Sequence, residues 1–271
     1  MARPGPRRDD AGSRAVPGWF AFVPGGRPAH FPGGRLISNA PAPARFRLEP
    51  PASPDISQLD GQGQGEQDVE RTGLKFGPLA PDSLHVCVDM QTLFSDGYPW
   101  ALPWFGRILP GLEALCAHRP AQTIFTRFIP ASRPGEGRGA WARYYQRWAA
   151  VTLAEIGAEA IDLAPALRRF APPARVVDKH VYSPWLEGGL DALLRDSGGD
   201  TLIISGGETD ICVMATVIGA IDRGYRVVLV ADGVCSFSDE THDAMLKMFA
   251  RRFSEQLEVC RIADVLDAWR R

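Results

Sequence analysis

From residue 82 onward, short apolar runs alternate with longer segments in which apolar residues recur at helical spacing. The strand-like runs cover 84–89, 122–125, 175–178, 201–205, 225–231 and 257–260. The helical segments cover 105–118, 141–156, 186–195, a stretch ending at 222, 239–253, and the chain from 262. Continuous β-branched runs separated by helices are typical of a parallel sheet buried on both faces. We therefore expect an α/β fold, a three-layer α/β/α sandwich around a mostly parallel sheet.

The first 80 residues have a different composition, with 12 Pro and 12 Gly. Such a segment cannot bury enough apolar surface to offset its ordering entropy. We predict a low-complexity, disordered N-terminal extension over 1–80 without a catalytic role, followed by one domain over 81–271. The eight Arg of residues 1–50 are scattered, which argues against a nucleic-acid arm. A translation start near Val69 or Leu74 is an open alternative, since no Met lies between Met1 and Met90.

Charge and cysteine usage narrow the function classes. The formal net charge is −2, so we expect no nucleic-acid partner, and no apolar run is long enough for a membrane-spanning helix. The five cysteines are widely spaced and include no C-x-x-C pair. This pattern argues against a disulfide framework or zinc knuckle and favours a reducing compartment. We expect a cytoplasmic protein.

Three reactive side chains follow predicted strands, where ligands bind in parallel sheets. They are Asp89, Lys179 and Cys212. Taken singly, each has an ordinary explanation: a capping carboxylate, a surface lysine, a small buried thiol. Together they suit acyl transfer, because a thiol near a helix N-terminus has a lowered pKa and a carboxylate can carry its proton. Backbone N–H groups of the turn at 206–208 could then receive an oxyanion.

The motifs around these residues resemble the isochorismatase-like cysteine hydrolase superfamily. They read VDMQ at 88–91, KHVYS at 179–183, SGGETDICV at 205–213 and ADGVCS at 231–236. The resemblance covers about residues 82–266 and implies Cys212 as nucleophile, Asp89 as general base and acid, and Lys179 as the charge that tunes both. It also implies a non-proline cis peptide at Gly207–Glu208, with the backbone amides of Glu208 and Cys212 forming the oxyanion hole.

The resemblance also separates the branches of the superfamily. Isochorismatases proper lack the cysteine, so Cys212 favours hydrolysis of a C–N bond. Nicotinamidases carry a metal site from an Asp-x-His segment, whereas this chain has Thr126-Arg127-Phe128 and no His between His118 and His180. We therefore expect neither metal nor cofactor. The expected activity is that of the N-carbamoylsarcosine amidase and ureidoacrylate amidohydrolase type, releasing ammonia from an N-carbamoyl, ureido or carboxamide substrate through a thioester.

The predicted substrate contacts rest on weaker signals. Gln91 and Phe94 match the superfamily's Asp-x-Gln-x-x-Phe spacing, in which the amide orients the substrate and the ring lines the pocket. Arg127, in the same region as Arg133 and Arg138, could pair with a substrate carboxylate. Four aromatic residues form two i,i+4 pairs on the helix after that region. We assign Trp141 and Tyr145 to the pocket, and the pair Tyr144 and Trp148 remains the alternative for it.

Other functions remain to be weighed. The same scaffold could bind a small acid or a partner protein without catalysis, as a regulator, although the complete set of Asp, Lys and Cys argues against this. A nucleotide-binding domain is disfavoured, because the glycines at 206–207 match neither the G-x-G-x-x-G nor the P-loop pattern. His242 and Cys235 are interpreted as structural. The resemblance further implies a homodimer or homotetramer.

Overall fold

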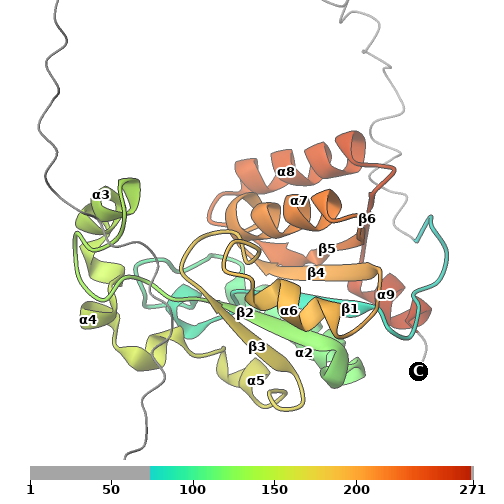
Figure 1. The fold of residues 1–271 in the computed structure, drawn as a ribbon, viewed down its shortest axis with the longest axis horizontal. Helices are drawn as coiled ribbons and strands as arrows, with labels where there is room; N and C mark the ends of the chain where they lie inside the picture. The colour runs from blue at the N-terminus through green and yellow to red at the C-terminus, as the bar shows by residue number, and fades with distance from the viewer. Residues whose placement is uncertain (1–73, 270–271) are drawn as a thin grey trace, which may run out of the picture. The chain divides into compact units, whose positions relative to one another are not determined.

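The computed structural model describes residues 74–269 (Figure 1). The predicted N-terminal extension lies almost entirely outside the described residues. Within them, no helix is long and apolar enough to cross a membrane.

A six-stranded parallel sheet forms the centre of the described domain. Its strands are adjacent in the order β3-β2-β1-β4-β5-β6, and every neighbouring pair runs parallel. The strands are β1 (Leu84–Val88), β2 (Thr123–Phe128), β3 (Arg175–Lys179), β4 (Thr201–Gly207), β5 (Arg226–Cys235) and β6 (Leu257–Cys260). The predicted parallel α/β fold is confirmed.

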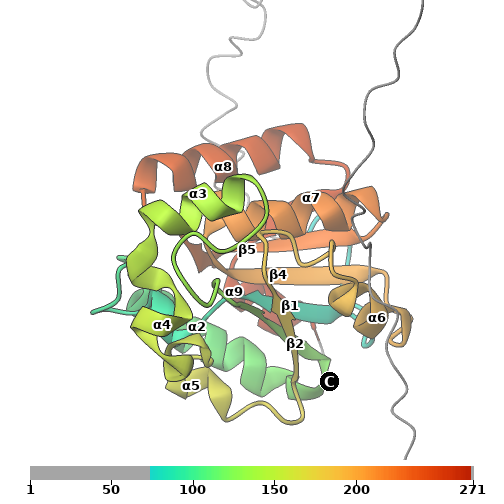
Figure 2. The same ribbon diagram turned by 60° about the vertical axis from the view of Figure 1, so that its left-hand side comes forward.

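Helices cover both faces of this sheet (Figures 1 and 2). One layer holds α2 (Phe105–His118), α5 (Pro165–Arg168) and α9 (Ile262–Ala268), and the other holds α6 (Gly189–Arg195), α7 (Met214–Asp222) and α8 (Asp239–Arg252). Alternate strand residues point into opposite layers: Ile203 packs with α2, while Leu202 and Ile204 pack with α7. The shorter elements are η2 (Thr92–Phe94), η3 (Pro120–Gln122), α3 (Ala140–Arg147), η4 (Ala149–Val151), α4 (Leu153–Ile156), η5 (Ala158–Ile161) and the π-helical turn η6 (Thr209–Val213).

The predicted long helix over 141–156 is wrong. The chain there forms three short pieces, α3, η4 and α4, beyond one end of the sheet (Figure 1). The N–H groups of Leu153 and Ala154 donate to the carbonyls of Ala131 and Ser132 instead of continuing a helical ladder. These bonds to the preceding loop replace the i→i−4 bonds that a continuous helix would need.

The strand order places a crevice at the carboxyl ends of β1 and β4. The chain moves outward from β1 to β2 and β3, then returns to place β4 on the other side of β1. Ligands bind at such a reversal of strand order. Gly206, at φ +108°, allows β1 and β4 to approach there, because a Cβ at this position would lie 2.1 Å from the carbonyl oxygen of Val88.

Candidate active site

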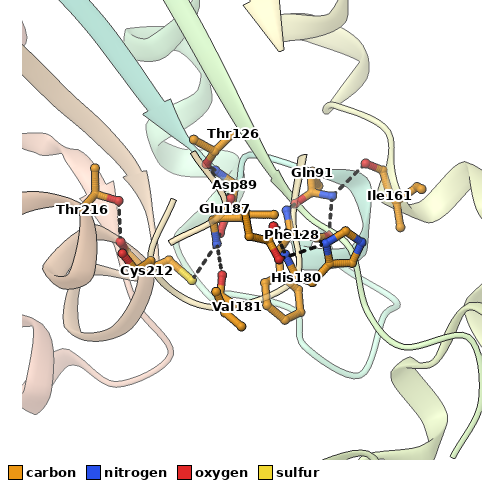
Figure 3. Close-up of polar contacts among 12 residues, drawn as sticks. Asp89, Gln91, Thr126, Phe128, Ile161, His180, Val181, Glu187, Cys212 and Thr216 are labelled. Carbon is orange, nitrogen blue, oxygen red and sulfur yellow. Dashed lines mark hydrogen bonds and ion pairs between the residues drawn. The ribbon is translucent and has the colours of Figure 1, made fainter. Parts of the chain in front are cut away.

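Three strand ends bring Asp89, Lys179 and Cys212 together. Asp89 and Cys212 are labelled in Figure 3. Asp89 follows β1, Lys179 is the last residue of β3, and Cys212 lies in η6 after β4. The Lys179 Nζ lies 2.7 Å from Asp89 Oδ2 and 3.4 Å from Cys212 Sγ. The structure therefore unites the three residues that the sequence singled out, in positions where a proton could pass between thiol and carboxylate.

Asp89 is held by the neighbouring strand β2. Its φ of +49° lies in the left-handed region, and its backbone N–H donates to the Thr126 carbonyl at 3.1 Å. The Thr126 hydroxyl donates to Asp89 Oδ1 at 2.6 Å, which leaves Oδ2 facing Lys179. Sequence analysis missed Thr126. Its signal was a polar residue inside a buried strand, at the level where β1 ends.

Lys179 is fully buried, and its ammonium group uses all three of its donors. They point to Asp89, to Cys212 Sγ and, at 3.2 Å, to the Val181 carbonyl. Burial alone would lower the pKa of Lys179, but the negative charge of Asp89, together with the hydrogen bonds to Asp89 and Cys212, outweighs it and the pKa is raised. Lys179 is therefore a permanent cation beneath the site.

The pKa of the Cys212 thiol is raised, whereas the sequence led us to expect a lowered one. Burial, followed by the negative charge of Asp89, raises the pKa of Cys212 well above its usual value, and Lys179 opposes this only in part. The single buried cation, Lys179, can balance one negative charge, and the carboxylate of Asp89 is already that charge. The thiol is therefore neutral at rest.

The peptide bond between Gly207 and Glu208 is cis, as the resemblance implied. Glu208 and Cys212 both line the cavity above the triad. The assignment of their backbone amides to an oxyanion hole stays a prediction.

The cavity in front of Cys212 has a volume of about 410 Å³, and half of its lining residues are aromatic. It lies between the carboxyl end of the sheet and the segment that carries α3. Its lining residues are Phe94, Pro99, Trp100, Phe128, Tyr144, Trp148, Tyr182, Glu208, Asp210, Ile211, Cys212, Phe237, Ser238 and Thr241. This volume fits a small substrate, not a polymer.

Among the predicted substrate contacts, Phe94 lines the cavity but Gln91 does not. Gln91 is fully buried, and its amide is used by backbone groups on two sides (Figure 3). Its Nε2 donates to the carbonyls of Phe128 and Ile161 at 3.0 and 2.7 Å, and its Oε1 accepts from the Phe128 N–H at 2.6 Å. The predicted substrate contact of Gln91 is not supported by this position, because its side chain joins β2 to η5.

Arg127 also has another role. Its guanidinium forms a two-bond pair with Asp178, at 2.7 and 2.9 Å, and lies 3.7 Å from Asp162. These carboxylates neutralise its charge, and Arg127 is not among the cavity-lining residues. The predicted pairing with a substrate carboxylate is therefore not supported by its position.

Of the two aromatic pairs in and directly after α3, the one that reaches the cavity is the pair given above as the alternative. Tyr144 and Trp148 line the cavity, while Trp141 and Tyr145 do not. Tyr145 is buried, and the Trp141 ring packs against those of Tyr145 and Tyr182. The predicted assignment of Trp141 and Tyr145 is therefore not supported by their positions; spacing alone defines the two faces but not which of them meets the cavity.

Two carboxylates that sequence analysis did not assign to the substrate, Glu208 and Asp210, also line the cavity. Burial, then the nearby charges of Asp210 and Asp89, raises the pKa of Glu208 to about 7. Asp210 accepts a hydrogen bond from the Ser236 hydroxyl. Their signal was the charged pattern E-T-D at 208–210, which ends two residues before Cys212.

His242 lies at the edge of this region and is bonded to the Thr209 hydroxyl at 2.9 Å. Burial lowers its pKa, so the ring is neutral near pH 7. Within residues 74–269, no group of three or more His, Cys, Asp or Glu side chains is arranged to hold a metal ion.

Comparisons with known proteins agree with this geometry. A family model described as an isochorismatase domain matches residues 83–260. Nicotinamidase 3 of Arabidopsis thaliana is 27% identical over 181 residues, which cover 66% of this chain and 86% of the relative. A cysteine hydrolase from Pseudomonas syringae matches with a TM-score of 0.61 and 23% identity, over 71% of this chain and 94% of that one. N-carbamoylsarcosine amidase from Thermoplasma acidophilum matches with a TM-score of 0.54 and 22% identity, over 66% and 96%.

Proposed function

Because the chain belongs to the isochorismatase family, we propose that it hydrolyses a small amide through a thioester on Cys212. The observation that supports this most directly is the contact of one buried lysine with both a carboxylate and a thiol beside a cavity that Cys212 lines. The nicotinamidase relative supports a carboxamide or related C–N bond as the bond that is cleaved.

Acylation begins with a neutral thiol. As Cys212 Sγ bonds to the amide carbonyl carbon, its proton passes to Asp89 and the carbonyl oxygen gains the negative charge. Lys179 contacts both Asp89 and Cys212, so its positive charge stabilises negative charge on either of them during the transfer. Asp89 then gives the proton to the leaving nitrogen, the C–N bond breaks, and ammonia and the thioester result.

Deacylation repeats these steps with water. Asp89 takes a proton from a water molecule while the oxygen of that water bonds to the thioester carbon. The C–S bond then breaks, and the sulfur recovers a proton. The overall reaction converts amide and water into carboxylic acid and ammonia, and returns Asp89 and Cys212 to their starting states.

A non-catalytic binding protein is the alternative. Such a protein would need the cavity but not a neutral thiol beside a base. The two functions differ in covalent chemistry, which gives a direct test.

We would incubate the protein with primary amides and N-carbamoyl amino acids, follow ammonia release, and acid-quench samples for mass spectrometry of the Cys212 peptide. The wild type should release ammonia and carry an acyl group on Cys212 during turnover. Cys212→Ala should do neither. Cys260→Ala is the matched control, since Cys260 is also buried and free but lies on β6 and does not line the cavity. Ammonia release by Cys212→Ala would rule out the thioester.

A further inference from the structure

The charged residues that line the cavity are both acidic. Glu208 and Asp210 contribute carboxylates to the wall, and none of the other lining residues is a lysine, arginine or histidine. Lys179 lies beneath the cavity floor without exposure and is neutralised by Asp89. The wall that a substrate meets therefore carries net negative charge.

The Glu208 carboxylate has no partner for that charge. Asp210 accepts a hydrogen bond from Ser236, but no group in the described part of the chain donates to the Glu208 side chain. A partly buried carboxylate without a donor or counter-ion is costly. Its environment favours an incoming group that supplies positive charge.

The aromatic walls have the same preference. The Trp100 ring lies 6.0 Å from Phe94, 6.1 Å from Tyr144 and 6.4 Å from Trp148, centroid to centroid. Ring faces carry negative electrostatic potential and attract cations, most strongly at Trp. Arg147 already stacks near the Trp148 ring, 5.8 Å from its centroid, without lining the cavity.

Other substrate charges fit this wall less well. A carboxylate substrate would meet Glu208 and Asp210, and Arg127, the predicted anion partner, is occupied by Asp178. A neutral aromatic amide would suit the rings but would leave the Glu208 charge unbalanced.

We propose that the substrate is an amide bearing a cationic group, such as an ammonium or quaternary ammonium, which sits beside Glu208 against the Trp100, Tyr144 and Trp148 rings. This inference rests on the proposed amide hydrolysis and specifies its substrate class. The raised pKa of Glu208, about 7, adds a signature: a bound cation favours the ionised carboxylate, so binding near neutral pH releases a proton.

The test compares amides of equal shape and different charge. Trimethylammonioacetamide and its longer homologues would be paired with their neutral tert-butyl analogues, and succinamate would serve as the anion. The kcat/KM from ammonia release should favour each cation of suitable length over its neutral partner by about tenfold or more, as expected for a charge-assisted contact. A preference for the neutral or anionic amides would overturn the proposal.

Two variants locate the effect. Glu208→Gln should reduce the ratio of cation to neutral kcat/KM by about tenfold, the loss of one charge–charge contact with a quaternary ammonium that has no N–H to donate. Glu255→Gln makes the same chemical change on an exposed residue that does not line the cavity, and should leave the ratio unchanged. An unchanged ratio in Glu208→Gln would refute the assignment of this carboxylate.

A binding measurement separates this proposal from the hydrolysis itself. Calorimetric titration with tetramethylammonium should show binding to wild type, with proton release near pH 7, and much weaker binding to Glu208→Gln. Tert-butyl alcohol is the neutral control. If the amides are not hydrolysed but tetramethylammonium binds through Glu208, the hydrolase assignment fails and the cation site stands. Equal or weaker binding of the cation than of the alcohol overturns the cation site.

Discussion

Replacing Glu208 with Gln should make the stability of the domain less dependent on pH. In the folded protein the pKa of Glu208 is raised from 4.5 to about 7, first by burial and then by Asp210 and Asp89. An unfolded chain has neither influence, so its Glu208 ionises near the ordinary value. Below about pH 4 the carboxyl group is protonated in both states and contributes no pH dependence.

The sign and magnitude follow from these two pKa values. As pH rises from 4.5 to about 7, the unfolded chain loses its proton more readily than the folded one, so the free energy of unfolding falls. Above the folded pKa the loss is complete. At about 1.4 kcal/mol for each pH unit, and allowing for water in the cavity, the total loss is about 1–3 kcal/mol. A glutamine does not titrate and avoids this loss.

Urea unfolding at a series of pH values would measure the effect. The stability of Glu208→Gln relative to wild type should increase by about 1–3 kcal/mol between acid and mildly alkaline pH. Glu255→Gln, on the surface, should show no comparable trend. A stability difference that is constant over the whole range, or that grows toward acid pH, would refute the account of Glu208 as a destabilised carboxylate.

Three further variants test the roles assigned above. Asp89→Asn should lower kcat by about 10²–10⁴-fold and also reduce the unfolding free energy, because it leaves the Lys179 charge buried without its partner; steady-state kinetics and urea unfolding measure both. Gln91→Leu removes three hydrogen bonds to Phe128 and Ile161 and should lower stability by about 3 kcal/mol, seen in urea unfolding, whereas a change in KM alone would restore Gln91 to the substrate. Arg127→Met should lower the free energy of unfolding by at most about 1 kcal/mol and should not raise the KM for an anionic amide such as succinamate.

The reactive residues were predictable because strand ends are marked in the sequence. Asp89, Lys179 and Cys212 each follow a β-branched run, and the carboxyl ends of parallel strands meet at one edge. The order of the strands was not needed for this inference. The sequence could not show that Cys212 is neutral at rest, since its pKa depends on burial and on the position of Asp89.

The substrate contacts were harder because they come from irregular segments. Gln91 was assigned from its spacing to Asp89, yet its amide bonds to backbone groups of Phe128 and Ile161, far apart in the chain. The two faces of α3 were separable by i,i+4 spacing, but the face that meets the cavity depends on how the chain breaks after Arg147. That break depends on hydrogen bonds to the loop at 131–132, which no local pattern records.

The reactive groups and the cavity walls come largely from different parts of the fold. The groups assigned to bond cleavage stand at or just beyond the ends of β1, β3 and β4, in the rigid sheet. The walls come largely from η2, the loop before α2, α3 with the residue after it, and the segment before α8. Wall residues can therefore change without moving Asp89, Lys179 and Cys212. Glu208 differs from these segments: it lies one residue beyond β4 and four before Cys212, so its backbone is positioned by the same strand that leads to Cys212. A charge preference that depends on Glu208 should thus persist when wall residues outside the proposed cation site, such as Thr241, are varied.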